Sequence, residues 1–161
     1  MSSPASSDLT RARAILRDVF GYPDLRVGQD EIVAAVLEGS DVLAVMPTGA
    51  GKSMCYQLPA LVREELVVVV SPLIALMRNQ VAQMRANGIA AGALNSTTDT
   101  AEWRAIMDDM NAGRLRLLYV APERLARPDT QDMLARAKVA MIAVDEAHCI
   151  SQWGQIGRAH V

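Results

Sequence analysis

Short apolar runs alternate along the chain with segments whose apolar residues recur at three- and four-residue spacing. The runs predict strands over 41–46 (DVLAVM), 66–70 (LVVVV), 89–95 (IAAGALN), 115–120 (LRLLYV) and 139–144 (VAMIAV). The periodic segments predict helices after each of the first four runs, ending near Val62, Gly88, Gly113 and Ala137. Strands without polar alternation between amphipathic helices indicate a mainly parallel sheet covered on both faces, which is a three-layer α/β fold.

Two further helical segments precede the first run. One has apolar residues from Leu9 to Val19 with Ser7 or Asp8 as its cap, and the other covers 31–37. Residues 1–7 are rich in Ser, Pro and Ala, so we expect them to be a disordered tail.

Five polar stretches follow the predicted strands directly: PTGAGKS, SPL, NST, APER and DEAH. Right-handed crossovers place the carboxyl ends of parallel strands at one edge of their sheet. We therefore expect these stretches to converge on one rim, where a ligand would bind.

Composition narrows the class of protein but not its ligand. The 161 residues suffice for about one domain, and a 51% hydrophobic content indicates a globular chain. The net charge of -2 shows no basic excess, although backbone N–H groups and a few local cations can still hold phosphates. Cys55 and Cys149 lack metal or disulfide spacing, and neither a secretory leader nor a membrane span is evident, so we expect a cytoplasmic protein.

The stretch MPTGAGKS (46–53) has the pattern of a phosphate-binding loop, with Met46 where the strict pattern has Gly. Its glycines let backbone N–H groups face phosphate at a helix N-terminus. Lys52 can reach the β- and γ-phosphates, and the Ser53 hydroxyl can ligate Mg²⁺. A glycine-rich turn without nucleotide is the alternative. The residues expected to bind nucleotide in this loop are Thr48, Gly49, Ala50, Gly51, Lys52 and Ser53.

Asp145 and Glu146 follow the last apolar run directly. A carboxylate at the end of a buried strand beside a phosphate loop can hold Mg²⁺, and the next one can orient an attacking water. Together with Lys52 and Ser53, the pair favours ATP hydrolysis, with Lys52, Asp145 and Glu146 as the catalytic residues. A solvated pair of acids at a strand end is the alternative for these two residues alone.

Several stretches in order resemble successive motifs of the RecQ family of ATP-dependent DNA helicases. They are FGYPDLRVGQDEI, MPTGAGKSMCYQLPAL, VVVSPLIALMRNQV, LNST, LLYVAPERL and AVDEAHCISQWG. The resemblance implies that residues 8–154 form the first RecA-like P-loop NTPase domain, incomplete at its C-terminal end. It also implies ATP and Mg²⁺ as cofactors, DNA as partner, and 3′–5′ unwinding in DNA repair and recombination, at the nucleoid of a bacterial-type cell.

The resemblance also assigns residues outside the phosphate loop. Tyr22 would pack on the adenine, and Arg26 and Gln29 would contact the nucleotide, with Gln29 reading the adenine edge. Tyr22 as a core aromatic is the alternative. The residues that would contact DNA or couple it to ATP hydrolysis are Ser71, Asn95, Ser96, Arg124, His148 and Trp153. Trp103 lies on a helical face outside these motifs, and we expect it to serve packing.

The resemblance ends after Gly154. Residues 155–161 (QIGRAHV) depart from the family pattern and show no apolar period, so we interpret them as a non-native tail. The family continues with a further core strand between the phosphate-loop strand and the acidic strand, and with a second RecA-like domain that supplies an arginine. We therefore expect the 161 residues alone to be poorly stable, to bind ATP weakly at best and not to unwind DNA.

Two other functions remain open from the sequence. An RNA helicase of the same superfamily would share the phosphate loop and acidic pair, although CISQWG argues against it. A non-catalytic nucleotide- or DNA-binding module is disfavoured because Lys52, Ser53, Asp145 and Glu146 are all present.

Overall fold

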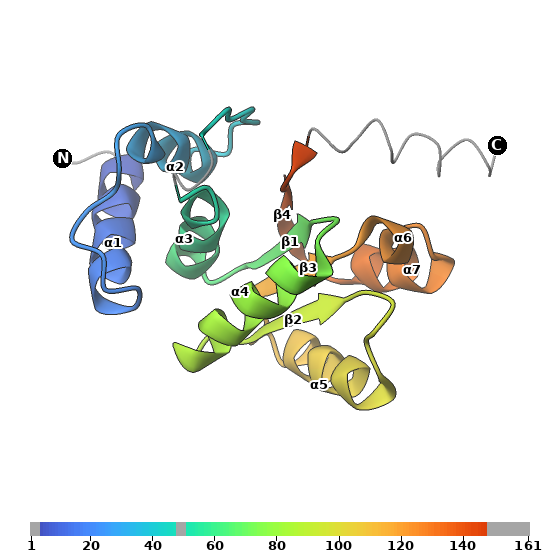
Figure 1. Cartoon of the computed structure of the whole chain (residues 1–161). Helices are drawn as coiled ribbons and strands as arrows, with labels where there is room; N and C mark the ends of the chain where they lie inside the picture. Colours follow the sequence, from blue (N-terminus) through green and yellow to red (C-terminus); the bar gives the residue numbers. More distant parts are fainter. Residues whose placement is uncertain (1–3, 48–50, 148–161) are drawn as a thin grey trace. The chain divides into compact units, whose positions relative to one another are not determined.

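The computed structural model describes residues 4–47 and 51–147 and divides into two compact units, with the division between Glu64 and Glu65 (Figure 1). We call the residues up to Glu64 the helical unit and those from Glu65 the sheet unit. His148, Cys149, Trp153 and the tail 155–161 lie outside the described residues.

The helical unit contains α1 (Pro4–Asp18), α2 (Gln29–Leu37) and α3 (Met54–Arg63). Their apolar stripes meet in one core, which contains Ala12, Leu16, Val33, Leu37, Leu58 and Val62. The Arg63 guanidinium donates to the Leu37 carbonyl and so ties the ends of α2 and α3 together. Helix α1 begins at Pro4, earlier than the predicted cap, so residues 4–7 form its first turn instead of a disordered tail.

The predicted strand over 41–46 is wrong. Residues 41–47 are described and adopt no regular structure, and Leu43 and Val45 are 88% and 93% exposed. The apolar pattern of this segment suits a strand, but a strand also needs a neighbour to pair its backbone N–H and C=O groups. No described strand pairs with it, so the segment lacks the hydrogen bonds that would fix it.

The sheet unit contains the other four predicted strands, and all are confirmed. They are β1 (Leu66–Val70), β2 (Ala91–Leu94), β3 (Leu117–Val120) and β4 (Val139–Val144). They pair in parallel in the order β2-β3-β1-β4. The connections contain α4 (Ile74–Ala86), α5 (Thr100–Asn111), α6 (Pro122–Leu125) and α7 (Pro128–Arg136). This four-stranded parallel sheet with connecting helices confirms the predicted α/β class.

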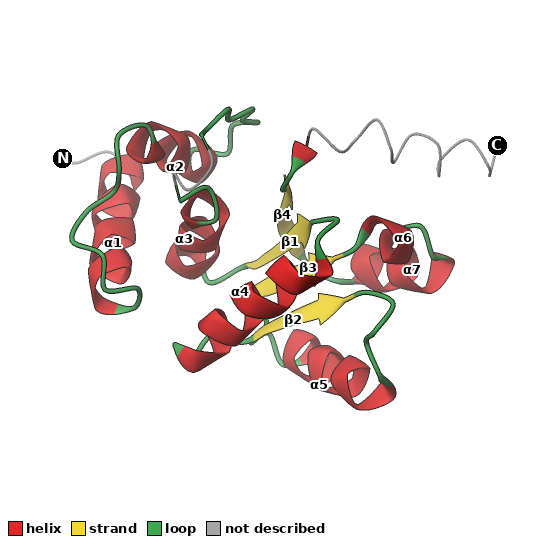
Figure 2. Cartoon of the chain, in the orientation of Figure 1, coloured by secondary structure: helices red, strands yellow, loops and turns green. Residues whose placement is uncertain are grey.

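Helices lie on both faces of this sheet (Figure 2). Helix α4 lies on one face and buries Met77, Val81 and Met84. The other face packs against α5 and α7 in a core of nine buried residues: Leu66, Val68, Val70, Leu94, Ile106, Leu115, Leu118, Val120 and Met133. Every residue of β1 is buried, as expected for a central strand of a doubly covered sheet.

Strand β4 is less covered than β1. Its residues alternate between half-buried and exposed, and Ile142 and Val144 are 65% and 44% exposed. Both lie in register with the buried residues Val68 and Val70 of β1. The predicted coverage of both faces therefore holds for the centre of the sheet but not for this outer strand. Within the described residues, no helix combines the length and apolar character that crossing a bilayer requires.

Candidate nucleotide and nucleic-acid site

Gln29 connects the predicted adenine motif to the phosphate loop inside the helical unit. Its side chain is 3% exposed, and its Nε2 donates to the Gly51 carbonyl at 2.9 Å. Its Oε1 accepts from the Arg26 N–H at 2.6 Å, while its own N–H donates to the Arg26 carbonyl at 2.9 Å. The amide thus bridges the segment before α2 and the segment before α3.

Gly51 occupies a position that only glycine fits. Its φ of +74° lies in the left-handed region, which disfavours any side chain. A Cβ built there would lie 2.4 Å from Gln29 Nε2, well inside van der Waals contact. The second glycine of the loop is therefore required both by the backbone turn and by the Gln29 side chain.

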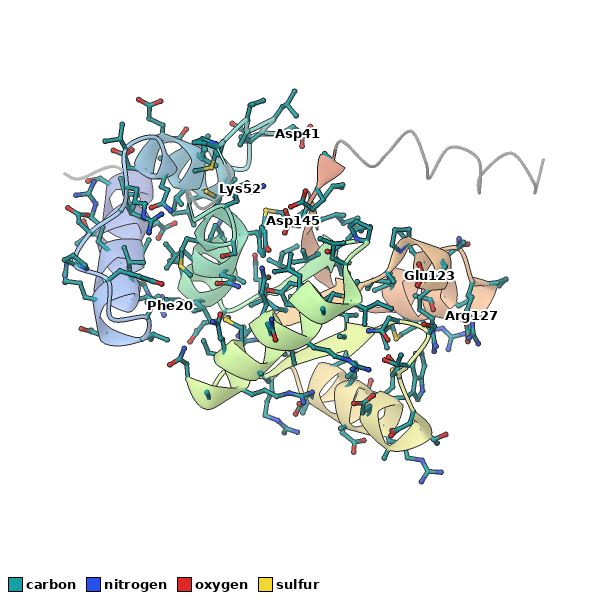
Figure 3. All side chains as sticks on the ribbon, in the orientation of Figure 1. Phe20, Asp41, Lys52, Glu123, Arg127 and Asp145 are labelled. Carbon is teal, nitrogen blue, oxygen red and sulfur yellow. The ribbon has the colours of Figure 1, made fainter. Side chains whose placement is uncertain are left out.

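Lys52 and Ser53 lead directly into α3, as the motif predicts. Ser53 is the N-cap of α3, yet its side chain makes no capping bond, and its carbonyl accepts from Tyr56 and Gln57. A hydroxyl at this position can serve as a hard oxygen ligand for Mg²⁺. Figure 3 labels Lys52 just before α3, where its ammonium group adds charge at the positive end of the helix. Thr48, Gly49 and Ala50 lie outside the described residues.

Tyr22 and Arg26 are exposed on the helical unit. The Tyr22 side chain is 49% exposed, which disfavours the alternative of a core aromatic and leaves its ring accessible to a base. Arg26 is held to Gln29 through its backbone, and its side chain is exposed. Contacts of these two residues with a nucleotide remain predictions.

The acidic pair ends β4 in the sheet unit, where Figure 3 labels Asp145. The Asp145 N–H still donates to the Val70 carbonyl at 2.9 Å, so its backbone continues the pairing with β1. Its Oδ1 accepts from the Glu146 N–H at 2.9 Å. Glu146 has φ +55°, a left-handed conformation that turns the chain sharply after the strand.

The Asp145 carboxylate and the Ser53 hydroxyl have oxygen atoms of the kind that Mg²⁺ binds. Within the described stretches, no three His, Cys, Asp or Glu side chains cluster into a metal cage. Mg²⁺ characteristically uses one or two carboxylates together with waters and substrate phosphates, so the Asp145 carboxylate and the Ser53 hydroxyl are each a type of ligand that it accepts.

The rim of the sheet unit carries four predicted stretches, because all four strands are parallel and each is followed by one of them. Ser71 and Asn95, expected to contact DNA, are only 1% and 2% exposed. Ser71 Oγ accepts from the Leu73 N–H at 3.4 Å. Ser96 is exposed, so it alone of these three presents its side chain to solvent. DNA contact remains a prediction for all three.

Arg124 is held at the start of α6 by an aromatic ring. Its guanidinium carbon lies 5.3 Å from the centroid of the Trp103 ring, within the range of a cation–π contact. Its Nε is buried without a hydrogen-bond partner. Trp103 therefore packs, as predicted, but its partner is the arginine that the APER motif had suggested for DNA.

Cys55 does not belong to the reactive groups of the site. Burial in α3 raises the pKa of its thiol to about 11, because desolvation disfavours the thiolate. Its Sγ lies 4.0 Å from Met46 Sδ.

Two relationships were not predicted from the sequence. One is the bond between Gln29 and Gly51, which joins motifs 22 residues apart. The other is an exposed arginine, Arg78, that donates to Thr97 Oγ1 at 2.7 Å. The Asn-Ser-Thr-Thr run of residues 95–98 does suggest a side-chain turn, since Asn favours such turns. Nothing in the pattern indicates which arginine meets it.

Comparison with known proteins decides the family. The family model described as DEAD/DEAH box helicase matches residues 26–160. The chain belongs to the DEAD/DEAH box helicase family.

The relatives of this chain include proteins named RecQ. It is 48% identical over 143 residues to "ATP-dependent DNA helicase RecQ" of Haemophilus influenzae, covering 89% of this chain and 23% of that protein. It is 44% identical over 147 residues to the protein of the same name from Bacillus subtilis, covering 91% of this chain and 25% of the relative. The chain thus spans about a quarter of the length of these curated relatives.

The fold has a solved counterpart. The structure described as a hypothetical ATP-dependent RNA helicase from Sulfolobus tokodaii has a TM-score of 0.68 at 18% identity. The match covers 95% of this chain and 45% of that one. At this identity the likeness concerns the fold alone, and it confirms the predicted α/β fold.

Proposed function

We propose that this chain is the ATP-binding motor part of a RecQ-type DNA helicase, which couples ATP hydrolysis to 3′–5′ unwinding of DNA. The observation that carries the proposal is the conformation of the end of the phosphate loop and the hydrogen bond that holds it. Gly51 turns left-handed directly before Lys52, Ser53 and α3, and buried Gln29 holds its carbonyl. The relatives at 44–49% identity are named as DNA helicases, and this supports DNA as the nucleic acid.

The residues have separate roles in this proposal. Lys52 would bind the β- and γ-phosphates, and Ser53 and Asp145 would each be a ligand of Mg²⁺, which would supply charge neutralisation. Glu146 orients the attacking water. Tyr22, Arg26 and Gln29 bind the adenosine, with Gln29 engaging both the base and the Gly51 carbonyl.

The DNA-binding surface lies at the carboxyl edge of the sheet unit in this proposal. Exposed Ser96 and the arginine held by Trp103 are its candidate contacts there. His148 and Trp153 would couple DNA binding to hydrolysis, and a second RecA-like domain would close on the nucleotide. We place the protein in the cytoplasm, on the nucleoid.

ATP hydrolysis by the full-length protein encoded by the gene tests this function, with and without single-stranded DNA or RNA of the same sequence. We expect stimulation by DNA above RNA. Lys52→Ala should abolish hydrolysis, and Glu146→Gln should lower its rate by roughly 10²–10⁴-fold, the usual contribution of a positioned base. Glu38→Gln, an exposed acid on the helical unit, is the control. A wild-type protein without ATPase activity, or one stimulated by RNA alone, contradicts the proposal.

A further inference from the structure

The segment between α1 and α2 begins with a sharp reversal of the chain. Gly21 has φ +73°, and its N–H donates to the Arg17 carbonyl at 3.1 Å. The Tyr22 N–H donates to the carbonyl of the buried Leu16, also at 3.1 Å. Residues 22–28 then run back alongside α1 toward the start of α2 (Figure 1). The backbone of Tyr22 is therefore hydrogen-bonded to the end of α1.

An ion pair joins this segment to the middle of α1. Arg13 Nη1 lies 3.8 Å from Asp24 Oδ1. The same carboxylate oxygen accepts from the Leu25 N–H at 2.8 Å, and Leu25 packs against the core of the helical unit. The Asp24 carboxylate is thus oriented by its own turn, and Arg13 links that turn to the helix.

The Arg13 side chain is buried along its stem and open at its end. Its side chain is 38% exposed and that of Asp24 is 61% exposed. Among the residues that the structure describes, Arg13 Nε is buried and has no hydrogen-bond partner. A buried N–H group without an acceptor lowers stability, and an exposed ion pair gives little of that loss back. Stability of the fold therefore does not account for an arginine at this position.

Pro23 transmits the position of Asp24 to Tyr22. Proline fixes its own φ and restricts the residue before it to extended conformations, so residues 22–24 form a stiff unit.

The far end of the segment is fixed separately, because the Arg26 N–H donates to Gln29 Oε1 and the Arg26 carbonyl accepts from the Gln29 N–H. Between these two ends, the contact of Asp24 with Arg13 is the side-chain link from the segment back to α1. The direction in which the segment presents Tyr22 therefore depends on Arg13.

We propose that Arg13 is a positioning residue for ATP, which acts through Asp24 to hold the segment that presents Tyr22 to the adenine. This inference rests on the proposed function and refines it, since it assigns part of the ATP affinity to a residue of α1. A segment that is ordered before the base binds loses less conformational freedom on binding than a loose one does.

Steady-state ATP hydrolysis by the full-length protein tests the inference. Arg13→Met should raise KM for ATP by about two- to fivefold, the range that an exposed ion pair allows, with kcat unchanged because Lys52 and Glu146 are untouched. Arg13→Lys keeps the charge and should restore most of the affinity. Arg11→Met is the matched control. Arg11 also lies on α1, but it pairs with Glu64 at 3.7 Å, outside the segment that carries Tyr22.

Three readouts separate positioning from a structural role. Arg13→Met should be no less stable than the wild type in urea unfolding, because it removes the buried Nε that has no partner. Inorganic triphosphate has no base, so its inhibition constant should be the same for the wild type and for Arg13→Met. In a Tyr22→Ala background, Arg13→Met should have no further effect on KM.

Several results would overturn the inference while leaving the proposed function intact. They are an Arg13→Met variant with the same KM as Arg11→Met, an equal rise in KM with and without the Tyr22 ring, and a parallel rise in the inhibition constant for triphosphate. If the wild-type protein does not hydrolyse ATP, the proposed function fails first and the inference fails with it.

Discussion

Replacing Gly51 with alanine tests the contact between the adenine motif and the phosphate loop. Two penalties should arise at once. The φ of +74° places an alanine in the left-handed region, and the new Cβ would lie 2.4 Å from Gln29 Nε2. The Gln29 side chain would have to move, because its Nε2 belongs to a buried amide that is hydrogen-bonded through both its oxygen and its nitrogen.

The size of each penalty can be estimated separately. The left-handed conformation costs a residue with a Cβ about 1–2 kcal/mol. Displacing Gln29 removes its bonds to Gly51 and Arg26, each worth about 0.5–1.5 kcal/mol. Gly51→Ala should therefore destabilise the helical unit by about 2–5 kcal/mol.

Urea unfolding followed by far-ultraviolet circular dichroism measures the total, and a double-mutant cycle with Gln29→Ala separates the two terms. Without the Gln29 side chain, only the backbone penalty remains, so Gly51→Ala should cost about 1–3 kcal/mol less there. Gly39→Ala is the matched control. Gly39 has φ +85° and open space around its Cβ position, so it should show the backbone penalty alone.

A coupling energy below about 0.5 kcal/mol between positions 29 and 51 would refute the reasoning, because independent sites add to within that margin. So would a Gly51→Ala variant no less stable than Gly39→Ala. Hydrogen exchange of the amides at the start of α3 gives an independent check, since they should lose protection in Gln29→Ala as well.

Three further outcomes are expected. Gly92→Ala should destabilise the sheet unit by about 1–3 kcal/mol in urea unfolding, because its Cβ would lie 2.5 Å from Ile106 Cγ1, and Ile106→Ala should remove most of that added cost. Cys55, whose thiol pKa is raised to about 11, should resist iodoacetamide at pH 8 in the folded protein and react after unfolding, as peptide-resolved mass spectrometry can show. The side-chain hydrogen bond from Arg127 lowers the pKa of Asp129, so its small stabilising effect is present above the ordinary pKa and is lost as pH falls through the lowered one. An NMR titration should find the Asp129 pKa nearer its ordinary value in Arg127→Gln.

The strands of the sheet were predictable because strands buried on both faces consist almost entirely of apolar residues. LVVVV at 66–70 has no polar residue, and it became a central strand buried along its whole length. The segment 41–46 is similarly apolar, yet it forms no strand, because an apolar composition does not provide a neighbouring strand to pair with. Strand β4 shows the same limit, since its pattern predicted burial and Ile142 is mostly exposed.

The site was predictable in kind but not in its contacts. Glycine, lysine and serine at fixed spacing indicate a phosphate loop, and the structure confirms its lead into α3. Whether a polar side chain faces a ligand or the interior depends on packing between distant segments. Asn95 is therefore buried where exposure was expected, and Gln29 bonds to a loop 22 residues away.

At Glu146 the left-handed backbone favours glycine for stability, whereas the proposed reaction needs the carboxylate. Glycine would suit φ +55° better than glutamate by about 1 kcal/mol, so a search for more stable variants should find Glu146→Gly favourable. The same substitution at Glu64, also at φ +55°, should bring a similar gain and leave the proposed ATP hydrolysis intact. A library selected for stability alone would accept both changes, whereas one selected for ATP hydrolysis should accept only the change at position 64. The difference between the two libraries would measure how far position 146 is kept for its carboxylate.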